Sequence, residues 1–248
     1  MANTKEVRKQ IASIKSTRKI TSALEMVAAS KIKKTQEQML RGRPYSEKVK
    51  DVIGHIANSS SEYDHPFYQD REAKTVCYVI VSSDKGLCGG LNTNLFKKVL
   101  VEAAANKEQG VEVSFALIGG KAVTFFGNLG GKILSQVTKM GDKPNPEDLI
   151  GFTKVILDEQ KKNSIDKVIL CSNRFVNTMT QEPTLQQLIP LVNETNEGLS
   201  AGQWDYIYEP EAKTLLDGLL TRYIEALIFQ AVLELSLIHI SEPTRHSA

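Results

Sequence analysis

The sequence predicts an α/β fold, in which a small Rossmann-like domain with a largely parallel sheet is flanked by long N- and C-terminal helices that form an antiparallel coiled coil. Three observations predict it. A helical pattern without Gly or Pro runs from Thr4 to about Leu40, strand and helix patterns alternate over 75–192, and a second strong helical pattern begins at Pro210. The length of 248 residues allows one large domain or two small ones.

The first helix is expected over residues 1–57. Its apolar residues recur at spacings of three and four, but the stripe drifts around the helix: Val7, Ile11, Ile14, Ile20, Leu24, Val27, Ile32 and Met39. Arg41-Gly42-Arg43-Pro44 should end or kink the helix, because Pro44 lacks an N–H and crowds the preceding turn. The helical pattern resumes from Tyr45 to Ile56.

The length of this helix is informative. At 1.5 Å per residue it spans about 55 Å to Leu40, or about 80 Å to Ile56. A compact domain of some 130 residues is only roughly 35–40 Å across. We therefore expect part of the helix to project beyond the domain and to need cover from elsewhere.

Charge is distributed unevenly. Residues 1–50 hold 13 Lys and Arg against 4 Asp and Glu, whereas the rest of the chain holds 18 against 25. A basic helix attached to an acidic body can bind nucleic acid, a lipid surface or acidic protein loops, and charge alone does not choose among them.

The middle of the chain, residues 75–192, is expected to be the α/β domain, after a polar linker over 58–74. Val76–Val81 is apolar without alternation, as in a parallel strand buried on both faces. The other expected elements are a helix capped by Asn92 or Thr93 that runs to about Lys107, strands at Val113–Ile118, Lys132–Val137 and Lys167–Cys171, an edge strand at Phe175–Thr180, and helices at Lys121–Asn128 and Pro146–Lys162.

A second polar linker, 193–208, precedes the C-terminal helix over 209–234. This helix carries pairs of apolar residues at helical spacing, which give it a wide hydrophobic face. Residues 235–248 are expected to be a separate tail, because Pro243 and the polar end should not prolong a coiled coil.

No set of residues indicates catalysis, a cofactor or a metal. The turn after the first strand fits neither G-x-G-x-x-G nor the P-loop pattern, so we interpret Asp84, Lys85, Gly86, Cys88 and Gly89 as a structural turn. No His lies near Cys88 in the sequence, and the four His residues form neither a metal set nor a triad. Three unpaired Cys and the absence of a signal peptide favour a soluble intracellular protein, and no apolar run reaches the roughly 20 residues of a membrane span.

Three sequence blocks resemble one known family. They are residues 11–31 (IASIKSTRKITSALEMVAASK), 83–92 (SDKGLCGGLN) and 204–210 (WDYIYEP). Together they are similar to the gamma subunit of the bacterial F-type ATP synthase, over about Val7 to Glu234. Leu24 departs from the pattern, because bacterial members often carry Met there.

The resemblance implies a non-catalytic rotor. In that family the terminal helices turn inside a ring of alternating alpha and beta subunits, and the α/β domain lies beside the epsilon subunit on the membrane c ring. The rotor couples ion flow to ATP synthesis in the beta subunits at the cytoplasmic face of the inner membrane, without entering the lipid. By position, Leu24, Glu25 and Met26 would contact the beta subunits, and Tyr206, Glu209, Lys31, Lys33 and Lys34 would belong to the foot near the c ring.

Residues 235–248 depart from the family pattern and resemble translated adapter sequence. Without the family's longer C-terminal helix, the upper first helix lacks a packing partner, and we predict that the isolated chain frays over Val7–Met26. Two other functions remain open. One is a nucleotide-dependent α/β enzyme. The other is a basic coiled-coil scaffold for nucleic acid, although no aromatic residue before Tyr45 could stack on bases.

Overall fold

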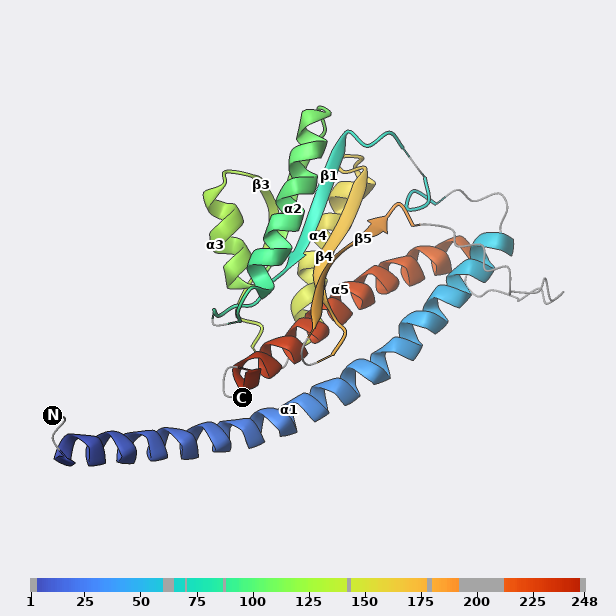
Figure 1. Ribbon diagram of the computed structural model, residues 1–248. Helices are drawn as coiled ribbons and strands as arrows, with labels where there is room; N and C mark the ends of the chain where they lie inside the picture. The colour runs from blue at the N-terminus through green and yellow to red at the C-terminus, as the bar shows by residue number, and fades with distance from the viewer. Residues whose placement is uncertain are drawn as a thin grey trace.

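The computed structural model describes residues 4–59, 65–69, 71–86, 88–141, 144–177, 180–191 and 212–245. Figure 1 shows a long helix and a second helix lying under a sheet domain. The elements in chain order are α1 (Thr4–Ser59), β1 (Thr75–Val81), α2 (Leu91–Glu108), β2 (Glu112–Ile118), α3 (Gly120–Asn128), β3 (Lys132–Val137), α4 (Glu147–Lys161), β4 (Lys167–Phe175), β5 (Gln181–Ile189) and α5 (Ala212–Arg245).

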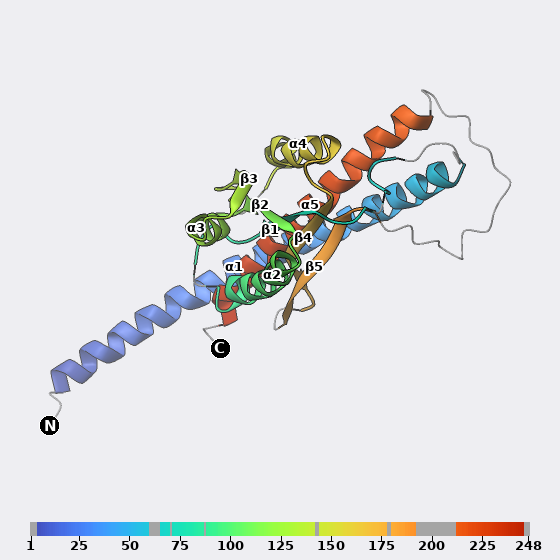
Figure 2. The ribbon, with the colours of Figure 1, turned by 90° about the horizontal axis from the view of Figure 1, so that it is seen from above.

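The five strands form one sheet in the order β3-β2-β1-β4-β5. Strands β1 to β4 are parallel and β5 is antiparallel to β4. Helices α2 and α3 cover one face, while α4 and α5 cover the other (Figure 2). The predicted fold class, a largely parallel α/β domain with long terminal helices, is therefore confirmed.

Strand β1 lies at the centre of the sheet and is buried on both faces. Val76, Tyr78 and Ile80 pack under α2 and α3, and the alternate residues Cys77 and Val79 pack toward α4 and α5. This arrangement explains why the strand is apolar without alternation.

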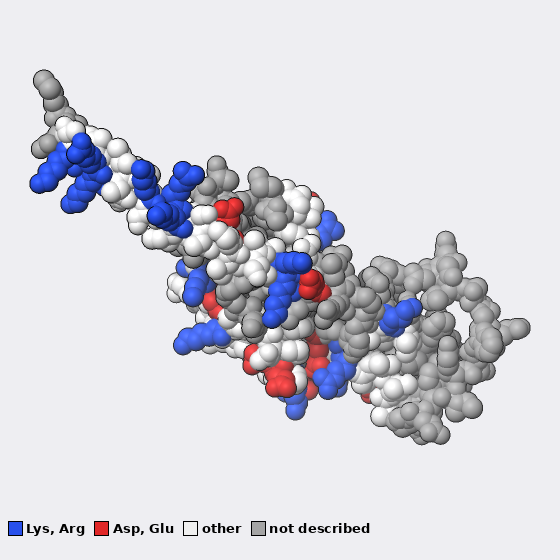
Figure 3. All heavy atoms as spheres, turned by 90° about the horizontal axis from the view of Figure 1, so that it is seen from below, with Lys and Arg blue, Asp and Glu red and all other residues white. Residues whose placement is uncertain are grey.

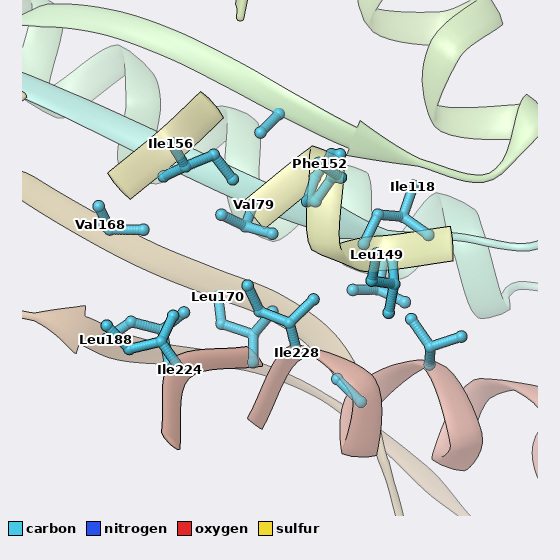
Figure 4. Close-up of a cluster of buried hydrophobic side chains, with 14 of the residues drawn as sticks. Val79, Ile118, Leu149, Phe152, Ile156, Val168, Leu170, Leu188, Ile224 and Ile228 are labelled. Atoms are coloured by element: carbon cyan, nitrogen blue, oxygen red, sulfur yellow. The ribbon is translucent and has the colours of Figure 1, made fainter. Parts of the chain in front are cut away.

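Helix α5 is part of the domain core. Ile224 and Ile228 point toward Leu170 of β4 and Leu188 of β5, as Figure 4 shows, and each of these side chains is at most 2% exposed. Burying an aliphatic side chain of this size stabilises the fold by about 1.5–3 kcal/mol. The C-terminal helix is therefore anchored on the sheet by apolar packing.

Helix α1 is continuous from Thr4 to Ser59. Arg41–Pro44 was expected to end or kink the helix. It does not end it, because α1 continues through Pro44, and Figure 1 shows α1 bending gradually along its length. Loss of the one backbone hydrogen bond that Pro44 cannot donate does not end a helix of this length. Its C-terminal half packs antiparallel against α5, with Val49 and Ile53 buried in the shared core.

Two expectations within the α/β domain were wrong. Helix α2 begins at Leu91 and its N-cap is Gly90, because the Asn92 side chain bonds to Ser83 instead of capping the helix. The expected edge strand at Phe175–Thr180 is not formed by the described residues there: β4 ends at Phe175, and Val176, Asn177 and Thr180 belong to no strand, with Val176 N–H donating to the Thr180 carbonyl at 3.3 Å. The edge strand is β5, which begins at Gln181.

The end of α5 also differs from the prediction. The helix continues through Pro243 to Arg245, and Leu235, Leu237 and Ile238 are buried. Apolar residues past Glu234 therefore continue the buried face of α5. The predicted linker over 193–208 lies outside the described residues.

Candidate functional site

The N-terminal half of α1 is an uncovered helix. Its apolar residues are exposed, including Ile14 at 67% and Met26 at 69%. Among the α1 residues whose side chains are described, Thr35 is the first that is buried, and Val49 and Ile53 follow it. Figure 1 shows this half of α1 extending past α5 and the sheet. An apolar stripe left in water at this scale marks a surface for another macromolecule.

This uncovered half is also strongly basic. Residues 4–34 hold nine Lys and Arg against two Glu. Figure 3 shows blue side chains along the projecting part of the helix, with red side chains on the domain body. The hydroxyls of Thr17 and Thr21 donate to the carbonyls of Ser13 and Thr17 within the helix, so these two groups are satisfied without a partner chain.

The predicted beta-subunit contacts fall in this uncovered half. Glu25 and Met26 are exposed, and Leu24 lies in the same turns of α1, although its side chain is outside the description. Lys33 and Lys34 are exposed near the start of the covered half, with Lys31 just before them in α1. The two other predicted foot residues, Tyr206 and Glu209, lie outside the described residues.

The turn after β1 binds the first turn of α3. Asp84 Oδ1 accepts from the N–H of Gly120 at 2.9 Å, the Ser83 carbonyl accepts from Lys121 N–H at 3.1 Å, and Ser82 Oγ accepts from Ala122 N–H at 2.8 Å. The first backbone donors of the helix are thus all used inside the protein. A nucleotide phosphate at this helix start would have to displace a carboxylate, which argues against a phosphate site here.

The same turn is tied to α2 by Asn92. Its Oδ1 accepts from Ser83 N–H at 3.2 Å, and its Nδ2 donates to Ser83 Oγ at 2.8 Å and to Cys88 Sγ at 3.1 Å. Lys85 is exposed, Gly86 is half-buried, and Gly89 has a φ of 54°. These contacts agree with the interpretation of the turn as structural.

The buried thiols are poor nucleophiles. Burial raises the pKa of Cys77 to about 12, although a hydrogen bond with Ser114 opposes the shift. Burial also raises the pKa of Cys171 well above its ordinary value. Both thiols are therefore protonated at neutral pH, and a thiolate is the form that reacts.

Within the described residues no group of three or more His, Cys, Asp and Glu side chains could hold a metal ion. In the same part of the chain, no helix has the length and apolar character needed to cross a membrane.

One feature of the structure was missed from the sequence. The buried ring of His65 places Nε2 2.9 Å from Asp217 Oδ1, which joins the segment after α1 to the start of α5. Tyr68, three residues further along the chain, has its pKa raised to about 12 by burial and by Tyr223 of α5. Nothing in the sequence near His65 indicated a partner on a helix so far along the chain.

The chain is similar in sequence to one protein family and in structure to solved proteins. The family model described as ATP synthase matches residues 3–241, which includes residues beyond Glu234. A solved chain from the central stalk and c ring of the Tetrahymena thermophila mitochondrial ATP synthase has a TM-score of 0.67 at 19% identity, over 92% of this chain and 97% of that chain. A chain of the Euglena gracilis mitochondrial ATP synthase rotor has a TM-score of 0.47 at 14% identity, over 86% of this chain and 88% of that chain. The chain belongs to the gamma subunit family of ATP synthase and is a rotor subunit of the central stalk.

Proposed function

We propose that this rotor couples ion flow through a membrane c ring to conformational change and ATP synthesis in the beta subunits of a surrounding alpha–beta ring. The observation that carries the proposal is the uncovered, basic and apolar half of α1. Such a helix is stabilised by packing far more than by its own propensity. The ring of alpha and beta subunits would pack against this half of α1.

The exposed side chains of this half suit such a ring. Apolar residues such as Ile14 and Ile20 would be buried on assembly, which favours binding by about 25 cal/mol per Å² of apolar surface. The surplus of Lys and Arg complements acidic loops on the ring and steers the approach of the subunits. Leu24, Glu25 and Met26 would contact the beta subunits as the rotor turns.

At the other end, the α/β domain would form the foot beside the epsilon subunit and on the c ring. Lys31, Lys33 and Lys34, with Tyr206 and Glu209, would contribute polar contacts there. The proposed location is the cytoplasmic face of the bacterial inner membrane, as a peripheral subunit held by protein contacts and not by lipid insertion.

The rotor makes and breaks no bonds itself in this proposal. A nucleotide-dependent enzyme is disfavoured because the first backbone donors of α3 bond to Ser82, Ser83 and Asp84. Binding of ATP by the isolated chain at micromolar concentration would revive that function. A nucleic-acid scaffold is disfavoured because the basic half of α1 has no aromatic residue before Tyr45 that could stack on bases. Steeply salt-dependent binding of generic DNA would revive that function.

The deciding experiment is assembly with alpha and beta subunits. The chain should form a stoichiometric complex that hydrolyses ATP. Ile20→Asp should weaken assembly about tenfold or more, because it places a carboxylate where an apolar side chain is to be buried. The matched control is Val101→Asp, which changes a residue of α2 that is 73% exposed, against 59% for Ile20, and should assemble like the unchanged chain. Equal assembly of both variants would contradict the proposed interface.

A further inference from the structure

The segment between α1 and β1 carries a compact strap, residues 65–69 (HPFYQ). Its Phe67 side chain is 1% exposed and belongs to the core that α4 and α5 share with the sheet. Although it is short and has no regular secondary structure, the strap contacts three elements of the domain. The strap is therefore part of the packed domain and does not only connect α1 to β1.

His65 is the residue that fixes the strap. Its Nδ1 accepts from the N–H of Phe67 at 3.0 Å, and its carbonyl accepts from the N–H of Tyr68 at 2.9 Å. The ring packs edge-on against Phe67, with centroids 4.6 Å apart. Because Nδ1 is an acceptor, Nε2 carries the proton and donates to Asp217 Oδ1 at 2.9 Å.

Asp217 lies at the start of α5, between the buried residues Leu216 and Leu220. The His65 side chain is 4% exposed and that of Asp217 is 46% exposed. A charge-assisted hydrogen bond from a buried ring is stronger than one between neutral groups. The contact thus holds the strap on the same edge of α5 that packs into the core.

Two further hydrogen bonds tie the strap to the rest of the domain. The Phe67 carbonyl accepts from Leu191 N–H at 2.7 Å, just after β5, and the Pro66 carbonyl accepts from Gln160 Nε2 of α4 at 3.4 Å. The strap therefore connects α5 to α4 and to the end of the sheet through directional bonds.

These hydrogen bonds add a directional attachment between the sheet domain and the rod, the antiparallel pair of α1 and α5. Among the described residues, α1 packs extensively only against α5, and the main contact of α5 with the sheet domain is β4. The α5 interface is apolar, and hydrophobic contact is non-directional, so it resists separation more than sliding. Directional hydrogen bonds to fixed partners resist sliding. The strap supplies them at the end of α5 that lies beside the end of α1 (Figure 1).

We propose that the contact between His65 and Asp217 is a torque-carrying clasp, in which His65 positions the strap on α5 so that rotation of the α/β domain passes to the α1–α5 rod. The inference rests on the role of the chain as a central-stalk rotor. His65 acts here as a positioning residue, since it touches neither nucleotide nor ion.

The test uses a complete ATP synthase reconstituted in vesicles with this chain as its rotor. Asp217→Ala and His65→Asn should lower ion-driven ATP synthesis several-fold while ATP hydrolysis by the complex with alpha and beta subunits alone stays unchanged, because that hydrolysis turns the rod without loading the foot. His65→Asn keeps an acceptor for Phe67 N–H but does not reach Asp217. His65→Gln can again donate to Asp217 and should restore part of the synthesis.

Glu225→Ala is the matched control. It removes an ion pair of similar length on the same helix. Because the partner Arg222 also lies in α5, the change breaks no connection between two elements. This variant should keep both activities.

Hydrogen exchange measures how often the strap detaches from the domain. In the isolated chain, Asp217→Ala should speed exchange of the Leu191 amide about tenfold, because the strap detaches more often. Faster exchange with undiminished synthesis would overturn the clasp as a carrier of torque, and so would equal loss of synthesis and hydrolysis. Failure of the unchanged chain to assemble with alpha and beta subunits would contradict the proposed function. Unaltered exchange of the Leu191 amide in Asp217→Ala would contradict the clasp alone.

Discussion

The Oδ1 atom of Asp84 accepts a hydrogen bond from the backbone N–H of Gly120 at 2.9 Å, which joins the end of β1 to the start of α3. The same oxygen accepts from Lys139 N–H, just after β3, at 3.0 Å. A carboxylate at the amino end of a helix also interacts favourably with the helix dipole. The Asp84 side chain thus links the end of β1, the start of α3 and the segment after β3. These lie at the carboxyl ends of the parallel strands, where nucleotide-binding α/β proteins hold phosphate.

Replacement of Asp84 should therefore destabilise the domain. Asp84→Ala leaves two backbone donors without their partner, and we expect a loss of about 1–3 kcal/mol in the free energy of unfolding, measured by urea denaturation. Asp84→Asn keeps an acceptor oxygen and should lose less. Lys85→Ala, at the exposed neighbour, is the control and should have little effect. An Asp84→Ala variant as stable as the unchanged chain would contradict this structural role.

Gly119 should tolerate no side chain. Its φ is 94°, and a Cβ atom there would lie 1.9 Å from the carbonyl oxygen of Ser82. Gly119→Ala should cost more than about 3 kcal/mol in the free energy of unfolding, because backbone strain and a backbone clash add.

The control for Gly119 is Gly127→Ala in α3, where a Cβ meets nothing within 4 Å and φ is ordinary. That change should stabilise the helix by about 0.5–1 kcal/mol. Thermal denaturation of the two variants should thus shift in opposite directions. Equal stability of both variants would show that the turn can move away from Gly119.

Much of the sheet domain could be predicted because its signals are local. Strand β1 is a continuous apolar run, and the helices α2 and α4 show apolar spacing with turn residues at their ends. Strand β5 could not be predicted, because Pro183, Gln186 and Gln187 give it little strand character. It is an edge strand, where Pro is tolerated, and pairing with β4 determines its structure.

The projection and charge of α1 were predictable for a different reason. The projection of α1 follows from its length against the size of the domain, and its basic charge is plain in the sequence. The contact of His65 with Asp217 was not predictable, since it depends on how the strap and α5 pack in three dimensions. The continuation of the buried face of α5 through Leu235 and Ile238 keeps the helical spacing of its apolar residues, but Pro243 led to the prediction of a separate tail after Glu234.

The raised pKa of Cys77 predicts alkaline loss of stability. The thiol has a pKa of about 12 in the folded protein, against an ordinary value of 9.0. A group with a raised folded pKa contributes stability that is full below its unfolded pKa and is lost as pH rises toward the folded pKa. The free energy of unfolding should therefore fall between about pH 9 and 12.

The control for this prediction is Cys77→Ala. Its free energy of unfolding should fall less steeply over the same pH range, although the variant starts from a lower value because of the cavity. Labelling of Cys77 by a thiol reagent should also be slow in the folded chain, because the buried thiol should react only after unfolding. Rapid labelling at pH 8 would show that the thiol is more accessible and more acidic than its burial implies.

The uncovered half of α1 should open readily in the isolated chain. Val7, Ile14 and Met26 are exposed, so residues 7–26 gain little from tertiary packing, which supplies most helical stability in water. Val49 and Ile53, in contrast, are buried against α5 and should open only with the whole domain. Amides in the uncovered half should thus exchange with solvent at least about a hundredfold faster than those around Val49 and Ile53. Binding of alpha and beta subunits should slow exchange in the uncovered half without changing it at Ile53. Strong protection over residues 7–26 in the isolated chain would mean that the helix is covered by this protein itself, and the proposed interface would then have to lie elsewhere.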